Sequence, residues 1–246
     1  MHIVEPAELP ALRHRFAPER PGPMIFEQVV ASGLGSCRTD RRQYPRVVIA
    51  EIAGNYALRG DPAHLPAGSG IRGLVEASPA WLPALRAIDP QLGVWNRIVH
   101  VLPDAVPTPP SSDGVRLLGR ADTAAIAALD RSLDWISESW GGPAGPAAAG
   151  VARGAFDGER LVAVATPFFV GTTFVDIGVV TEEGHRGRGL STACTAAVIA
   201  DVRADGQRPC WTTSPDNTAS AGVATRSGFV LDRTDVLYAV GVPIPD

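Results

Sequence analysis

The sequence predicts an α+β fold, a mixed and mostly antiparallel sheet flanked by helices. Residues 150–180 contain three strand-forming apolar stretches joined by Asp-Gly and Gly-Thr turn pairs, which predicts an antiparallel meander. Residues 190–202 carry apolar side chains at a helical period, and residues 209–229 continue with a short strand and a second helix. Helices that alternate with strands in this way cover the faces of a sheet.

The first hundred residues also read as α+β. Residues 44–61 predict two strands around a turn, and residues 92–102 predict another strand. Residues 78–88 predict a helix, because Ser78 is a good N-cap and Pro79 suits the first helical position.

The predicted domain boundary lies in residues 103–114, which are rich in proline and small polar residues and resemble a linker. We therefore expect a smaller α+β domain in residues 1–102. A second domain would span residues 115–246, since a chain of 246 residues can form two compact units.

Within the second domain, residues 115–136 predict a strand followed by a helix, and the meander comes next. The helix from residue 190 and the strand–helix pair after it lie between this meander and the end of the chain. Residues 229–233 and 235–242 predict two final strands.

The turn before residue 190 has the composition of an anion site. Arg186, Gly189 and Ser191 fit the spacing R-x-x-G-x-small, and Gly187 adds a second glycine. Glycine permits unusual backbone angles and lets a phosphate approach the backbone N–H groups. The start of the helix adds unpaired N–H groups and about half a positive charge. This pattern predicts a pyrophosphate site.

Other anion-binding motifs do not fit these residues. A P-loop needs a lysine, and the chain contains none; a dinucleotide fingerprint needs a third glycine where Thr192 stands. One Arg-Gly turn on an acidic protein does not indicate nucleic acid. The remaining alternative is a solvated turn with no ligand.

The segment after the strand at residues 209–214 carries a second pattern. Asp216 or Asn217 is expected to cap the next helix, and Gly228 is expected to end it. Gly222 lies inside this helix, where glycine is unfavourable by about 1 kcal/mol relative to alanine. A glycine there suggests close approach by another group.

Taken in order, these two patterns resemble those of the GNAT superfamily of acyl-CoA N-acyltransferases over about residues 115–242. The first signature is carried by Arg186, Gly189 and Ser191, with serine in place of the usual glycine or alanine, and the second by Asn217, Ser220, Gly228 and Phe229. The chain is most similar to the zwittermicin-resistance-type branch, through Asp176, Ile177, Thr181, Pro209 and Trp211. In that branch the first domain looks like a degenerate half of the same fold, which would shape the acceptor side and bind no second coenzyme A.

The resemblance implies acetyl transfer from acetyl-CoA, as co-substrate, to the primary amine of a small molecule by direct attack. The predicted coenzyme A-binding residues are Val179, Val180, Thr181, Arg186, Gly187, Arg188, Gly189, Leu190, Ser191, Thr192, Asn217 and Ser220. A backbone N–H of Val179, Val180 or Thr181 would stabilise the tetrahedral oxyanion. Asp176 is the first choice for the base that deprotonates the amine, with a surface-facing or turn aspartate as the equal alternative. Glu182 and Glu183 are expected to be solvated.

The resemblance also exposes one departure. Many GNAT enzymes protonate the leaving thiolate with a tyrosine four residues before the Gly-Phe pair, where this chain has Ala224. Ser220, a water molecule or the helix dipole could substitute. The alternative function is a catalytically weak sensor or regulatory module that binds coenzyme A. Residues 136–150, rich in glycine and proline, are expected to form a mobile flap on the acceptor side.

Composition sets the remaining expectations. The net charge of −4 favours neither nucleic acid nor membrane partners, and no apolar run reaches the roughly 20 residues of a membrane span. We expect a cytoplasmic protein whose oligomeric state, monomer or homodimer, is open. Three cysteines, Cys37, Cys194 and Cys210, suggest neither a disulfide framework nor a metal site.

Overall fold

The computed structural model describes residues 1–108, 112 and 114–245. Contacts divide the chain into two compact units. Unit 1 contains Met1–Glu19, Pro23–Arg97 and Thr234–Asp246, and unit 2 contains Arg20–Gly22 and Ile98–Arg233. This division differs from the predicted boundaries at both ends, because it falls inside a strand at residues 97 and 98 and assigns the last residues to unit 1. Residues 109–111 and 113 of the predicted linker lie outside the described residues.

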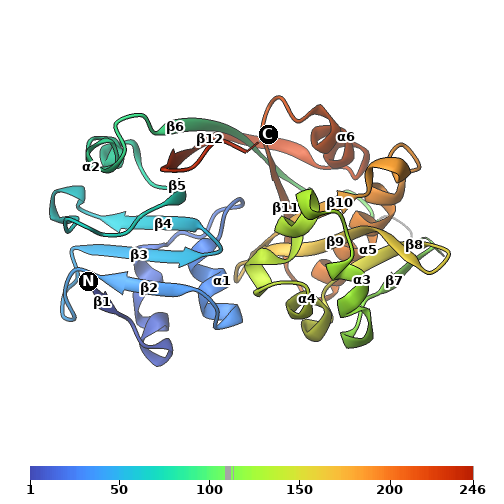
Figure 1. The fold of residues 1–246 in the computed structure, drawn as a ribbon, viewed down its shortest axis with the longest axis horizontal. Coiled ribbons are helices and arrows are strands. Elements are labelled where there is room, and N and C mark those ends of the chain that lie inside the picture. The colour runs from blue at the N-terminus through green and yellow to red at the C-terminus, as the bar shows by residue number, and fades with distance from the viewer. Residues whose placement is uncertain (109–111, 113, 246) are drawn as a thin grey trace. The chain divides into compact units, whose positions relative to one another are not determined.

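Unit 2 is built on a mixed sheet in the order β7-β8-β9-β10-β11-β6 (Figure 1). Its strands are β7 (Val115–Leu117), β8 (Arg153–Asp157), β9 (Arg160–Val170), β10 (Phe174–Thr181), β11 (Arg208–Thr213) and the end of β6 (Gly93–Val101). Neighbouring strands are antiparallel except for β10 and β11, which are parallel. The predicted meander corresponds to β8, β9 and β10.

Helices cover both faces of this sheet. One face carries α5 (Leu190–Ala204) and α6 (Thr218–Arg226). The other carries η4 (Arg120–Asp122), α3 (Thr123–Ala127), η5 (Arg131–Trp140) and α4 (Ala144–Ala149). The single helix predicted up to residue 136 is therefore wrong: the chain forms separate short helices there, and Asp130 caps η5 by accepting the N–H of Ser132 at 2.9 Å.

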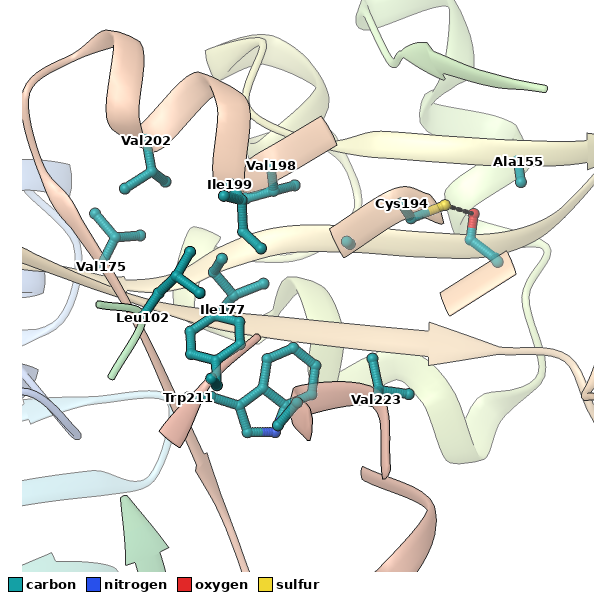
Figure 2. Packing of buried hydrophobic residues seen from close by; sticks show 14 residues of the cluster. Leu102, Ala155, Val175, Ile177, Cys194, Val198, Ile199, Val202, Trp211 and Val223 are labelled. Carbon is teal, nitrogen blue, oxygen red and sulfur yellow. Dashed lines mark hydrogen bonds between the residues drawn. The ribbon is translucent and has the colours of Figure 1, made fainter. Parts of the chain in front are cut away.

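The core under α5 fixes the helix against the middle of the sheet. Figure 2 shows the valine and isoleucine side chains of α5 directed at β10, where Val175 and Ile177 alternate with residues of the opposite face. A bidentate ion pair between Arg153 of β8 and Asp201 of α5, at 2.6 and 2.7 Å, adds a polar tie. The start of α5 is thus held at the carboxyl end of β10.

Unit 1 repeats the same strand order, β1-β2-β3-β4-β5-β12. Its strands are β1 (His2–Ile3), β2 (Ser36–Thr39), β3 (Val47–Ile52), β4 (Asn55–Gly60), β5 (Gly73–Glu76) and the end of β12 (Val230–Val240). Again one pair is parallel, here β4 with β5. The two strands predicted near the end of the chain are the single strand β12, and only its last residues pair with β5.

The helices of unit 1 do not match those of unit 2. They are η1 (Pro6–Arg15), α1 (Ile25–Ser32), η2 (Pro62–His64), η3 (Pro79–Trp81) and α2 (Leu82–Ile88). Between the parallel strands β4 and β5, residues 61–72 are all described and contain only the three-residue η2. The equivalent connection in unit 2 contains the 15-residue α5. Unit 1 therefore offers no helix start beside its parallel pair.

Candidate active site

The glycines of the predicted anion site have the backbone angles that the sequence suggested. Gly187 and Gly189 adopt φ values of +75° and +78°, which residues with a Cβ rarely tolerate. A Cβ added to either glycine would meet no atom of the chain within 4 Å. The two glycines therefore leave open space along the turn, where a ligand could contact the backbone.

Helix α5 begins behind this turn without a capping side chain. Gly189 is the N-cap and has no side-chain oxygen to offer. The first N–H that bonds back to the turn is that of Ala193, to the carbonyl of Gly189 at 3.0 Å. The N–H groups of Leu190, Ser191 and Thr192 precede it and are available to an anion. The turn therefore has the open backbone N–H groups of an anion site.

The two arginines of the turn are held by contacts within unit 2. Arg186 Nε donates to the carbonyl of Thr181 at 3.3 Å, and Arg188 Nη1 pairs with Asp157 Oδ2 at 3.2 Å. His185 Nε2 lies 3.0 Å from the same Asp157 oxygen. The Arg188 and His185 contacts hold the pKa of Asp157 below its usual value. Asp157, in the predicted turn with Gly158, thus holds His185 and Arg188 of the anion site in place.

A pair of hydroxyl groups joins β10 to α5. Thr181 Oγ1 and Ser191 Oγ lie 2.8 Å apart, and the Thr181 side chain is buried. The side chains of these two predicted residues therefore position the start of the helix, which leaves their backbone N–H groups to contact a ligand.

The parallel pairing of β10 with β11 stops early. It spans Phe174 to Asp176 on β10, although β10 runs on to Thr181 and β11 to Thr213. The edge of β10 beyond Asp176 is consequently unpaired with β11. Val179, Val180 and Thr181, which were predicted to bind coenzyme A, lie on this part of β10.

Strand alternation decides which N–H groups reach this edge. Glu182 donates to Val162 of β9 at 2.9 Å, and N–H groups alternate in direction along a strand. The N–H groups of Val179 and Thr181 therefore point to the unpaired edge, whereas that of Val180 points to β9, opposite Val164. The three predicted oxyanion donors are thus reduced to two, and Val180 contributes its side chain to the core instead.

Asp176 lies where the parallel pairing ends, beside a bulge between Asp176 and Ile177. Its side chain is buried, with the residue 6% exposed, so the alternative of a surface-facing aspartate is wrong. Its Oδ1 accepts a hydrogen bond from Thr212 Oγ1 at 3.2 Å and faces Cys210 Sγ at 3.9 Å. A carboxylate is thereby placed three residues before Val179.

The second signature forms the predicted capped helix. The side-chain oxygen of Asn217, rather than Asp216, accepts the N–H of Ser220 at 3.0 Å. Ser220 Oγ in turn accepts the indole N–H of Trp211 at 3.0 Å. Ala224 is fully buried in the core under α5 and α6. The Ser220 hydroxyl can therefore still donate its own proton.

Two other expectations concern α6 and the loop after β10. The group that approaches Gly222 is a side chain of the same helix, since a Cβ there would lie 3.0 Å from the guanidinium of Arg226. Glu182 is buried rather than solvated: it accepts the N–H of Asp130 at 2.9 Å and pairs with Arg160 at 3.1 Å. Glu183 is exposed, as expected.

The expected flap consists of η5 and α4, and η5 is attached to β9. Trp140 Nε1 donates to the carbonyl of Pro167 at 2.6 Å, and Thr166 Oγ1 donates to that of Ile136 at 3.2 Å. These contacts anchor the η5 part of the expected flap to the sheet.

Sequence reasoning missed the aromatic residues beside the site. Trp135 of η5 packs edge-on against Phe168 of β9 with ring centroids 5.5 Å apart, and Phe168 packs similarly against Phe169 at 4.7 Å. We call these three residues the aromatic cluster. Gly178 was the available signal, because a glycine inside a strand marks close approach. A Cβ there would lie 3.2 Å from Trp135 Cζ3.

Comparison with known proteins identifies the family. The model of the GNAT acetyltransferase family matches residues 113–238. An uncharacterized N-acetyltransferase in the mutA 5′ region of Streptomyces virginiae is 37% identical over 206 residues, covering 81% of this chain and 87% of that protein. The chain belongs to the GNAT acetyltransferase family. It is a GNAT N-acetyltransferase.

Solved structures share the fold of this GNAT protein. A GCN5-related N-acetyltransferase-like protein from Streptococcus suis matches with a TM-score of 0.71 and 18% identity, covering 96% of this chain and 99% of that chain. A tandem GNAT protein from the clavulanic acid biosynthesis pathway matches with a TM-score of 0.55 and 15% identity, covering 97% and 94%. In the described part of the GNAT chain, no helix is long and apolar enough to cross a membrane. No three metal-ligating side chains gather there either.

Proposed function

We propose that this GNAT protein transfers the acetyl group of acetyl-CoA to the primary amine of a small molecule. The observation that carries the proposal is the uncapped start of α5 behind Gly187 and Gly189, which lies next to the unpaired edge of β10. Six backbone N–H groups, from residue 187 to residue 192, would hold the pyrophosphate. Asn217 and Ser220, at the start of α6, are the proposed contacts for the pantetheine arm.

The proposed chemistry uses three groups along β10 and α6. Val179 or Thr181 would donate its N–H to the carbonyl oxygen of the thioester, where negative charge develops. Asp176 would accept a proton from the attacking ammonium group, directly or through a water molecule. The amine nitrogen then bonds to the acetyl carbon and gives up a second proton to water as the carbon–sulfur bond breaks, and the thiolate takes up a proton. Ser220 is the proposed donor of that proton and would regain one from solvent.

Unit 1 is proposed to be a second half of the same fold that holds no coenzyme A. The support is its repeated strand order together with the connection between the parallel strands β4 and β5, where residues 61–72 contain no helix longer than the three-residue η2. Its predicted role on the acceptor side stays a prediction. Calorimetric titration with acetyl-CoA should give one site per chain, and two equivalent sites would contradict this proposal.

The test of the main proposal is release of free coenzyme A from acetyl-CoA in the presence of a panel of small amines. Saturable, amine-dependent release supports the transferase. The alternative of a sensor draws on Ala224, which is buried where many family members carry an acid. Tight acetyl-CoA binding without turnover on any amine would favour the sensor.

A further inference from the structure

The aromatic cluster lies on the same face of the sheet as the proposed base. Asp176 and Phe169 are directly opposite one another on β10 and β9, and opposite residues of an antiparallel pair share a face. Thr212, which bonds to Asp176, belongs to the same face. The cluster and the carboxylate are therefore neighbours on the side of the sheet covered by η5.

Trp135 also lies close to the reacting carbonyl in the proposed site. Its Cζ3 atom would be 3.2 Å from a Cβ at Gly178, which immediately precedes Val179 and its edge-facing N–H. Trp135 is nevertheless 39% exposed. The indole thus contacts the strand that would bind the thioester and still has exposed surface that another molecule could contact.

We propose that Trp135 is a specificity-determining residue that binds an aromatic ring on the acceptor, and that the substrate class is amines joined to an aromatic ring by a short spacer. The inference rests on the proposed function. Aromatic rings favour edge-to-face or offset contacts with one another beyond the burial of their area. A ring held by Trp135 would place a nearby amine beside Asp176 and the acetyl carbon, so the spacer must be short.

The negative charge of the proposed site also fits amines joined to an aromatic ring. An amine of this type is an ammonium ion near neutral pH, and the Asp176 carboxylate lies beside rings whose faces attract cations. The four guanidinium–ring contacts in the described residues involve Phe16, Trp95, Phe156 and Phe174, so none of them covers the aromatic cluster.

The experiment compares kcat/KM for phenethylamine and 2-cyclohexylethylamine, which have the same carbon skeleton and differ in the aromaticity of the ring. The wild type should prefer phenethylamine by about 5-fold to 10-fold, the effect expected of an aromatic pair. Trp135→Leu keeps an apolar side chain and should reduce the ratio to about one, whereas Trp135→Phe should retain part of it. Leu117→Ala, at another exposed apolar side chain of unit 2, is the control and should leave the ratio unchanged.

The outcomes separate this inference from the proposed function. The KM for acetyl-CoA and the circular dichroism spectrum identify a variant that has simply lost its fold. Turnover of both amines without a preference in the wild type, or an equal ratio in Trp135→Leu and the wild type, overturns the role of Trp135 alone. No coenzyme A release with any amine overturns the proposed function and the inference with it.

Discussion

Substitution of Gly189 by alanine tests the anion site most directly. The added Cβ meets nothing within the chain, so the only internal strain is that of a φ of +78° in a residue with a side chain. That strain is about 1 kcal/mol or somewhat more, and should lower the thermal midpoint by about 2–4 °C in a chain of this size. The same Cβ would occupy space next to the first-turn N–H groups. Weakening one or two of their charge-assisted bonds to phosphate predicts about 10-fold to 100-fold weaker binding of acetyl-CoA.

Calorimetric titration with acetyl-CoA measures the affinity, and a matched glycine and a truncated donor provide the controls. Gly184 also has open space around its Cβ but no positive φ, so Gly184→Ala should retain wild-type affinity. Acetyl-pantetheine lacks the pyrophosphate, so kcat/KM with this donor should be about the same in Gly189→Ala and in the wild type. If Gly189→Ala loses stability but binds acetyl-CoA normally, the pyrophosphate does not sit on this turn.

Three further predictions concern the rest of unit 2 and the cysteines. Asp176→Asn keeps an oxygen that can accept the Thr212 hydrogen bond but cannot accept a proton. The kcat should therefore fall by about 100-fold or more while the KM for acetyl-CoA stays similar, and unchanged turnover would exclude Asp176 as the base. Arg116 and the N–H of Gly119 lower the pKa of Asp122 to about 2, so the contribution of Asp122 to stability is present above pH 4 and is lost as the pH falls from about 4 to about 2. The free energy of unfolding of Asp122→Asn, measured from denaturation curves, should therefore depend less on pH in that window than that of the wild type. Burial raises the pKa of the Cys37 and Cys194 thiols to about 12, and Cys210 is buried as well. A thiol reagent at pH 8 should therefore label the native chain only at the rate at which the chain unfolds, and rapid labelling would contradict this burial.

The strands and helices around the anion site were predictable because their signals are local. Glycines with positive φ, an asparagine N-cap and turn pairs each act within a few residues, and the structure has them where the sequence indicated. The same is true of α5, whose apolar period packs against β10. Local signals therefore predicted the turn and the two helices without any knowledge of tertiary contacts.

The errors arose where distant residues decide the local structure. Glu182 looked like a loop residue, yet it caps the backbone at Asp130, 52 positions earlier. That contact helps to begin η5 where a continuous helix was expected. Trp135 likewise gives no signal in sequence, since its importance depends on Gly178 and Phe168 on two other elements. Nothing within a window of a few residues could have shown these pairings.

The repeated strand order gives a physical reason why only one unit should carry the chemistry. Both units contain a parallel pair of strands. Such a pair alone offers a ligand only the ends of its strands. In unit 2 the connection between the paired strands is long enough to contain α5, whose start adds N–H groups and positive charge beside the edge of β10. In unit 1 the corresponding connection is residues 61–72. It is shorter than a helix of the length of α5, which takes 15 residues and spans about 22 Å before any residues for the return path are counted. The short connection between its parallel strands therefore supports the proposal that unit 1 binds no second coenzyme A.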